Sequence, residues 1–153
     1  MIHFEPITNE KFQDYWKYSV ESWTRDMQRA GLIKGEITFE EAERDVRKFL
    51  PDGLSTGGHH IMNIVDDGEV VGTIWYEVRD RVMREAYLWD IFIDENRRGM
   101  GYGKEAMREL EESVRKEGAG RIQFNVFGFN SVARNLYLKM GYQDAAVTMM
   151  KYL

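Results

Sequence analysis

Cysteine is absent from the chain of 153 residues, and proline occurs only 2 times. The lack of cysteine excludes disulfides, thiolate metal ligands and cysteine nucleophiles. No apolar run approaches the roughly 20 residues that a membrane-spanning helix needs. The first ten residues carry two glutamates and no basic cluster, so they do not resemble a signal peptide. We therefore expect a cytoplasmic protein without a membrane partner.

The composition is that of an ordinary globular domain. Hydrophobic residues make up 43% and charged residues 31%, a balance that excludes intrinsic disorder. The length suits one domain over residues 1–153, with helices in 1–60 and a sheet in 61–153. The net charge of −5 argues against a nucleic-acid partner and is compatible with a cationic one.

Two amphipathic helices are predicted near the N-terminus. Apolar residues recur every three or four positions from Phe12 to Met27, which predicts a helix over about 8–30 with Thr8 as its N-cap. Thr38 and Glu41 have the spacing of a capping box and predict a second helix that ends near residue 50.

The rest of the chain alternates strand and helix patterns. The expected elements are strands at 61–65, 70–79 and 85–93, a helix at 104–117, a strand at 121–127, a helix from Asn130 or Ser131 to Met140, and a last strand at 147–152. Antiparallel hairpins followed by a β–α–β–α unit indicate an α+β (mixed α/β) fold, not a doubly wound parallel sheet.

A glycine-rich turn, Arg98-Gly99-Met100-Gly101-Tyr102-Gly103, separates the strand at 85–93 from the helix that follows. Glycine permits positive φ angles and lets a ligand approach the backbone without a Cβ in the way. The helix start adds free N–H groups and the positive end of the helix dipole. The turn is therefore a candidate phosphate or pyrophosphate site, with a tight turn that binds nothing as the alternative.

Two other phosphate motifs fit poorly. A P-loop that ends at Gly103-Lys104 requires glycine at position 98 and serine or threonine at 105, where the chain has Arg98 and Glu105. A dinucleotide fingerprint requires its glycines directly after the strand, and residues 94–98 intervene.

Two motifs in this order resemble the Gcn5-related N-acetyltransferase (GNAT) superfamily. The turn matches the pattern Q/R-x-x-G-x-G/A through Arg98, Gly101 and Gly103. The second signature, N-x-x-A-x-x-L-Y-x-x-x-G-F/Y, is matched by Asn130, Ala133, Leu136, Tyr137, Gly141 and Tyr142. The resemblance implies the GNAT fold, a central, mostly antiparallel twisted sheet flanked by helices, with splayed fourth and fifth strands.

The resemblance also implies acetyl-CoA as the co-substrate, no metal, and direct transfer of the acetyl group to a primary amine of a small molecule, peptide or protein. The turn is expected to hold the pyrophosphate and the preceding strand the pantetheine, with an amide near Ile91 directed at the thioester carbonyl. The cofactor-binding residues implied are Ile91, Phe92, Ile93, Arg98, Gly99, Met100, Gly101, Tyr102, Gly103, Lys104 and Asn130.

Tyr137 is the expected general acid, because a phenol of pKa ~10 can protonate a leaving thiolate. It also lies on the apolar stripe of its helix, so core packing is the alternative. Some family members carry a basic glutamate five residues before the signature asparagine, where this chain has Asn125, which cannot accept a proton. We favour Asp90 as the general base, with Glu77 or a chain of water molecules as alternatives. The alternative for Asp90 is a purely structural role, as a buried carboxylate that accepts hydrogen bonds from backbone N–H groups.

Other groups give weaker signals. His59 and His60 lack a third metal ligand, so contacts with an acceptor are expected rather than a metal site. Four tryptophans are candidates to line an acceptor cavity through cation–π contacts, although the first two also suit the core face of a helix: Trp16, Trp23, Trp75 and Trp89.

Three functions are consistent with these patterns. The favoured one is an N-acetyltransferase whose acceptor is selected by residues 16–60. The second is a sensor that binds acyl-CoA without turnover, and the third is a regulatory domain that binds a nucleotide. A homodimer is compatible with a β-rich C-terminal edge.

Overall fold

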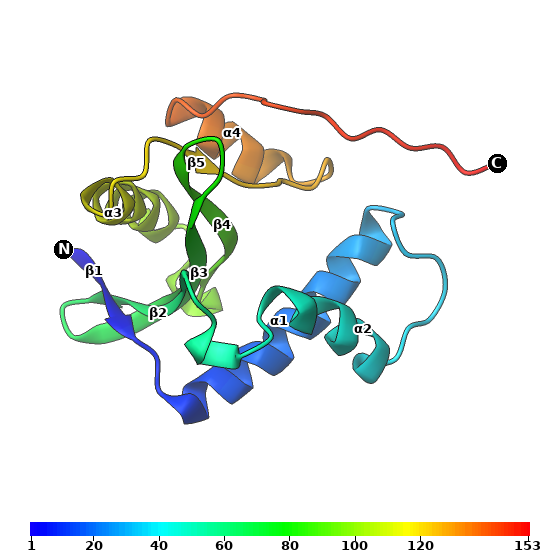
Figure 1. Cartoon of the computed structure of the whole chain (residues 1–153), viewed down its shortest axis with the longest axis horizontal. Helices are drawn as coiled ribbons and strands as arrows, with labels where there is room; N and C mark the ends of the chain where they lie inside the picture. Colours follow the sequence, from blue (N-terminus) through cyan, green and yellow to red (C-terminus); the bar gives the residue numbers. More distant parts are fainter.

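A computed structural model describes residues 1–153 as one sheet with helices on both sides (Figure 1). The strands are β1 (Ile2–Pro6), β2 (His59–Asp66), β3 (Glu69–Asp80), β4 (Arg84–Ile93) and β5 (Ile122–Gln123). The helices are α1 (Asn9–Arg29), α2 (Phe39–Val46), α3 (Tyr102–Lys116) and α4 (Ser131–Lys139), with short 3₁₀ turns η1 (Arg47–Phe49), η2 (Gly53–Ser55) and η3 (Glu95–Arg97). None of these helices has the length and apolar character required to cross a membrane.

The sheet has the strand order β1-β2-β3-β4-β5. The first four strands are antiparallel to their neighbours, and β4 is parallel to β5. The β4–β5 pairing involves only Ala86 with Ile122 and Tyr87 with Gln123. Beyond Tyr87, therefore, β4 has no strand neighbour on that side. The predicted fold class, including the separation of the fourth and fifth strands, is confirmed.

Two hydrophobic cores cover the two faces of the sheet. On one face, α3 buries Ala106, Met107, Leu110 and Val114 against the strands. On the other, α1 and α2 pack over Ile61 and Trp75 through Phe12, Trp16, Val20, Ala42 and Val46. The spacing of the apolar residues in each helix produces these faces. Helices thus cover both faces of the sheet. The end of the sheet at which β4 and β5 separate lies between these two helical layers.

The predicted helix starts are confirmed by their caps. Thr8 accepts a hydrogen bond from the N–H of Lys11, and Thr38 forms a complete capping box with Glu41. The second helix ends at Val46 and continues as the 3₁₀ turn η1, so its apolar pattern reaches residue 49 as expected.

Several strand predictions were wrong. The sequence analysis missed β1, which is too short to show a clear alternation and exists through its pairing with β2. The strand expected at 121–127 is regular only at Ile122–Gln123, because β4 leaves it after two residues. The strand expected at 147–152 does not form, because residues 143–153 make no backbone hydrogen bond with another part of the chain. The strand expected at 61–65 begins two residues earlier, because His59 and His60 are the first residues of β2.

A β-bulge in β4 lies beside the open end of the sheet. Trp75 of β3 pairs with Asp90, whereas the next residue, Tyr76, pairs with Leu88. Trp89 is therefore the extra residue, and the alternation of side chains is interrupted there. As a result, Trp89 stacks on Trp75 at 5.5 Å and Asp90 reaches Tyr15 of α1, so both project toward the α1–α2 side.

Candidate functional site

The glycine-rich turn adopts the backbone shape that its sequence predicts. Gly99 and Gly101 have φ angles of 76° and 88°, and Gly101 caps the N-terminus of α3. The N–H groups from Gly99 to Lys104 donate no hydrogen bond within the chain. A Cβ built on Gly99, Gly101 or Gly103 would meet nothing within 4 Å. Six free amides beside open space at a helix start form a site that fits a pyrophosphate.

The side chain of Arg98 folds back onto the end of β4. Its Nε donates to the carbonyl oxygen of Ile93 at 2.9 Å, and its guanidinium lies 5.4 Å from the ring centre of Phe92. Arg98 therefore fixes the turn relative to the end of β4, Ile91–Ile93, which pairs with β3 but has no neighbour on its β5 side. Met100 and Lys104 are exposed at the rim of the turn.

Tyr102 and Asn130 hold the starts of two helices. The Tyr102 hydroxyl donates to Asp66 at 3.0 Å, which ties the first residue of α3 to the end of β2. Asn130 accepts the N–H of Ala133 at 3.3 Å and caps α4, as the sequence predicts. The amide nitrogen of its side chain makes no hydrogen bond to the protein and is free for a ligand.

Asp90 lies where β4 loses its neighbour. Its carboxylate accepts a 2.7 Å hydrogen bond from the hydroxyl of Tyr15 in α1. Burial raises the pKa of Asp90 above its usual range, and the nearby Asp26 carboxylate adds to this shift. A carboxylate with a raised pKa is a stronger base than one in water.

Tyr137 of α4 packs edge-on against Phe124 at 4.6 Å and lies 6.0 Å from the ring of Tyr142. Burial raises the pKa of its phenol, and the charge of Asp90 raises it further. The phenol stays protonated at neutral pH, as a proton donor must.

A cavity of about 130 Å³ lies between α1, η1 and the bulge of β4. Five aromatic rings, two carboxylates and two hydroxyls line it, and no lysine or arginine does: Trp23, Phe49, Trp75, Trp89, Phe127, Asp26, Asp90, Ser19 and Ser22, together with Val46. Such a lining favours a cation on an apolar body. Asp90 belongs both to this cavity and to the open end of β4.

The four tryptophans divide between the hydrophobic core and the cavity. Trp16 is buried in the α1–α2 core, whereas Trp23, Trp75 and Trp89 line the cavity. The sequence analysis missed Asp26, Phe49 and Phe127, which come from three distant segments. The only signal for Asp26 is its place three residues after Trp23, on the same side of a helix.

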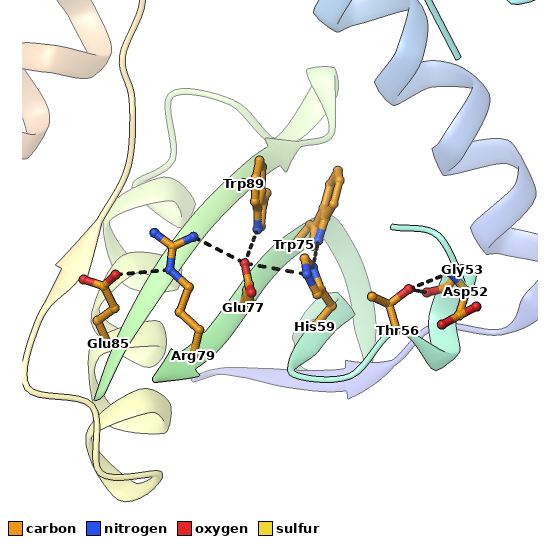
Figure 2. Close-up of polar contacts among 9 residues, drawn as sticks. All are labelled: Asp52, Gly53, Thr56, His59, Trp75, Glu77, Arg79, Glu85 and Trp89. Carbon is orange, nitrogen blue, oxygen red and sulfur yellow. Dashed lines mark hydrogen bonds and ion pairs between the residues drawn. The ribbon is translucent and has the colours of Figure 1, made fainter. Parts of the chain in front are cut away.

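Two polar groups behind the cavity hold its indoles, as Figure 2 shows. The Trp75 indole N–H donates to His59 Nδ1 at 3.0 Å, and the Trp89 indole N–H donates to Glu77 at 3.2 Å. Burial lowers the pKa of His59, so its ring is neutral at pH 7. Since Nδ1 accepts a hydrogen bond, the proton lies on Nε2, which is 3.6 Å from the Glu77 carboxylate.

Glu77 is therefore placed to hold Trp89 and not to meet a substrate. Its carboxylate also lies 3.6 Å from Arg79, and Glu77 is not among the residues that line the cavity. Of the two candidate bases, only Asp90 faces the cavity. His60 projects to the opposite face of the sheet, where it stacks on Tyr76 at 4.8 Å.

A buried ion cluster supports the junction of β4 and β5. Glu85 is 2% exposed and accepts hydrogen bonds from Arg79 at 3.1 Å and from Arg121 at 2.6 Å. Figure 2 shows the chain of contacts from Glu85 through Arg79 to Glu77. The two guanidinium groups hold the pKa of Glu85 below its usual range, with the Arg121 hydrogen bond as the largest cause.

Two other possible sites are less suited to chemistry. A larger hollow of about 250 Å³ near the end of α3 contains neither Asp90 nor Tyr137. No three histidine, aspartate or glutamate side chains converge as metal ligands would. The turn, the open end of β4 and the aromatic cavity therefore define the candidate site.

Residues 9–142 match the acetyltransferase (GNAT) family, and the chain belongs to that family. It is 29% identical to YycN of Bacillus subtilis, which is named as an uncharacterized N-acetyltransferase, over 99% of both chains. It is 31% identical to YdgE of Bacillus subtilis, which has the same description, over 97% of this chain and 96% of that one.

Solved structures agree with this assignment. The crystal structure of YycN superposes with a TM-score of 0.93 and covers 100% of this chain and 99% of its own. An acetyltransferase from Clostridium acetobutylicum, whose crystal structure is described with acetyl-CoA, shares the fold at a TM-score of 0.66 and 14% identity, over 99% of this chain and 96% of its own.

Proposed function

We propose that this protein transfers the acetyl group of acetyl-CoA to the primary amine of an acceptor with an apolar or aromatic body. The observation that carries the proposal is the juxtaposition at Asp90. Asp90 belongs to the part of β4 that has no neighbour on its β5 side and that leads to the six free amides, and it also lines a cavity of aromatic rings and carboxylates.

The donor side fits a diphosphate and a peptide-like arm. The free N–H groups of the glycine turn supply hydrogen bonds without the Cβ atoms that would block approach. The end of β4, Ile91–Ile93, pairs with β3 on one side, and on the free β5 side it offers backbone groups to an arm that contains amides. Acetyl-CoA supplies the activated acyl group, and the turn and the strand orient it.

Asp90 is proposed as the general base. An amine of pKa ~10 is almost entirely protonated at pH 7, so it must lose a proton before it can attack a carbonyl. The raised pKa of Asp90 makes its carboxylate a better acceptor for that proton, and the hydroxyl of Tyr15 fixes its orientation. Asp90 takes this first proton from the ammonium and later releases it to solvent; the second proton, which the nitrogen loses once the C–N bond has formed, passes to solvent and balances the proton gained by the leaving thiolate.

Tyr137 is proposed as the general acid. When the C–S bond breaks, the sulfur carries the electron pair and needs a proton. The phenol of Tyr137 is held by Phe124 and Tyr142 and stays protonated because its pKa is raised. It donates to the thiolate, and solvent then restores its proton.

The acceptor class follows from the lining of the cavity. An ammonium is attracted to Asp26 and to the faces of the three indoles, whereas an anionic acceptor is repelled. The small volume and the aromatic walls favour an arylalkyl or short alkyl amine over a sugar amine with many hydroxyls, because the latter would leave polar groups without partners.

An assay of thiol release from acetyl-CoA over a panel of amines tests the proposal. We expect Asp90→Asn and Tyr137→Phe to lower kcat by about 100-fold or more, with the Kd for acetyl-CoA unchanged. The wild-type rate should fall as the pH is lowered, because activity is lost as Asp90 gains its proton, and the apparent pKa of this fall should lie above the usual pKa of aspartate. Asp90→Asn should remove this pH dependence.

Two controls separate the alternatives. Tyr142→Phe removes a neighbouring phenol that bonds Glu111, and Glu77→Gln retains an acceptor for Trp89; both should keep most of kcat. A loss in Glu77→Gln equal to that in Asp90→Asn would contradict the assignment of the base. Tight acetyl-CoA binding without turnover for any amine would instead identify a sensor.

A further inference from the structure

His59 is buried behind the acceptor cavity but does not line it. Its side chain is 8% exposed, and its ring lies 6.1 Å from the ring of Trp75 and 6.1 Å from that of Trp89. Both indoles are walls of the cavity, and they stack on each other at 5.5 Å. His59 has no part in the proton transfers proposed above. A buried ring in this place can act on an acceptor only through the two walls that it touches.

Packing alone does not fix the orientation of the Trp75 indole. The torsion that turns an indole about its Cβ–Cγ bond has a broad, roughly two-fold preference, so the ring can turn over and still fill a similar volume. The hydrogen bond from the indole N–H to His59 Nδ1, at 3.0 Å, selects one orientation. Trp75 is only 3% exposed, so water cannot replace this bond if His59 stops accepting it.

The protonation state of His59 decides whether this hydrogen bond exists. Nδ1 accepts only when it carries no proton, and the Glu77 carboxylate, 3.6 Å from Nε2, favours the tautomer with its proton on Nε2. A second proton would go to Nδ1 and would place two donors, Nδ1–H and the indole N–H, 3.0 Å apart. One of the two rings would then have to turn away. Neutral His59 is therefore the form that holds Trp75, as Figure 2 shows.

The groups around His59 act on its ring in opposing directions. Burial lowers the pKa of His59 most, Glu77 of β3 raises it, and His60 of β2 and Arg79 of β3 lower it. The two indoles beside the ring carry no titratable group. The net shift of the pKa is downward from the usual value of 6.5. His59 is thus neutral at pH 7, and its protonated form becomes populated as the pH falls through the lowered value.

We propose that His59 is a positioning residue that sets the affinity for the acceptor through the orientation of Trp75, and that it releases this wall of the cavity when it gains a proton. The inference rests on the acceptor cavity of the proposed function. An indole that is fixed in advance costs nothing to order when the acceptor binds, whereas ordering one loose side chain lowers affinity roughly two- to tenfold.

Two substitutions separate the hydrogen bond from ring stacking and from charge. His59→Asn places a carbonyl oxygen where Nδ1 lies and gains no proton, whereas His59→Phe keeps a ring beside Trp89 and has no acceptor. Calorimetry at about pH 7.5 measures the Kd for phenethylamine. We expect it to stay within about twofold of the wild type in His59→Asn and to rise roughly five- to tenfold in His59→Phe, with the Kd for acetyl-CoA unchanged in both. Equal Kd values for phenethylamine in the two variants would overturn the proposal.

A measurement on the wild type covers the case in which His59→Phe fails to fold. Asp26 also lines the cavity, and a proton on its carboxylate weakens the binding of an ammonium but not of a neutral molecule. Phenethyl alcohol is therefore the second probe. Its Kd should rise several-fold in the wild type as the pH falls from about 7.5 to about 4.5, and it should stay constant in His59→Asn. A constant Kd for the alcohol in the wild type would overturn the proposal.

The failure of this inference differs from the failure of the proposed function. A wild type that releases thiol from acetyl-CoA with phenethylamine, but whose affinity does not respond to the changes at His59, would contradict only the role of His59. A wild type that binds both probes as expected but acetylates no amine would contradict the transfer reaction and leave the role of His59 intact. A wild type that binds neither probe would contradict the acceptor cavity and, with it, this inference.

Discussion

The proposed donor and acceptor sides of the site are built in opposite ways. The donor side is one continuous stretch, the glycine turn with the end of β4, and it presents mainly backbone groups. The acceptor cavity draws side chains from α1, η1, β3, β4 and the segment after β5. Backbone recognition is specified by a few glycines in a row, whereas side-chain recognition depends on how distant segments pack.

This difference explains what each side can tolerate. A change in the turn acts on the φ angle or on the space next to the ligand, so a single Cβ is enough to affect binding. A change in the cavity alters one of about ten lining groups, so its effect is smaller and specific to the acceptor. The following predictions test this asymmetry.

The largest effect is expected from Gly101→Val. A branched residue resists the φ angle of 88° and places methyl groups beside the free amides, so acetyl-CoA binding should weaken by roughly 100-fold or more. Calorimetry measures the Kd. The matched control is Gly35→Val, since Gly35 has a φ angle of 79° and an equally open surrounding outside the turn. If both variants bind acetyl-CoA like the wild type, the turn is not the donor site.

A loss of about 2–3 kcal/mol in unfolding free energy is expected from Glu85→Gln, which leaves Arg79 and Arg121 without their shared carboxylate. Because the folded-state pKa of Glu85 is lowered, its contribution is present above the unfolded pKa and disappears as pH falls through the lowered value. Urea unfolding at pH 7 and pH 3 measures this change.

The contrast for Glu85 is Glu112→Gln, which breaks an exposed pair with Arg115 and should cost less than about 0.5 kcal/mol. Equal losses in the two variants would mean that burial adds nothing to the Glu85 cluster. Neither Glu85→Gln nor Glu112→Gln should change the affinity for acetyl-CoA or for the amine, since the Glu85 cluster supports the β4–β5 junction and lies outside both proposed binding sites.

A smaller and selective effect is expected from Asp26→Asn. Loss of this charge should raise the KM for a cationic amine roughly tenfold and leave the Kd for acetyl-CoA unchanged. Since Asp26 raises the pKa of Asp90, the acidic limb of the rate profile should also move to lower pH. Asp14→Asn, on the exposed side of the same helix, should change neither quantity. An unaltered KM in Asp26→Asn would remove Asp26 from the acceptor site.

The general fold and the conformation of the glycine turn could be predicted because their signals are local. Caps at Thr8, Thr38 and Asn130 and the glycine spacing each involve residues within a few positions of one another. The cavity could not be predicted in the same way. Phe49 and Phe127 reach it only through long-range packing, and neither has a distinctive neighbour in the sequence.

The strand errors have a related cause. A strand exists through its neighbour, so β1 forms with little pattern of its own and residues 124–127 lose regularity where β4 departs. At 147–152 the pattern is that of a strand, but no neighbouring strand pairs with this segment. Local propensity describes what a segment can form, and pairing decides what it does form.

The bulge at Trp89 bears on how this site can change over evolutionary time. In a regular strand, consecutive codons encode side chains on opposite faces, so an aromatic wall and a proton acceptor could not come from adjacent positions. The irregular pairing beside Asp90 removes that restriction. If Trp89 were deleted, an aromatic ring and a carboxylate could no longer come from adjacent residues on the same face of β4. One of these two side chains would then have to come from another strand.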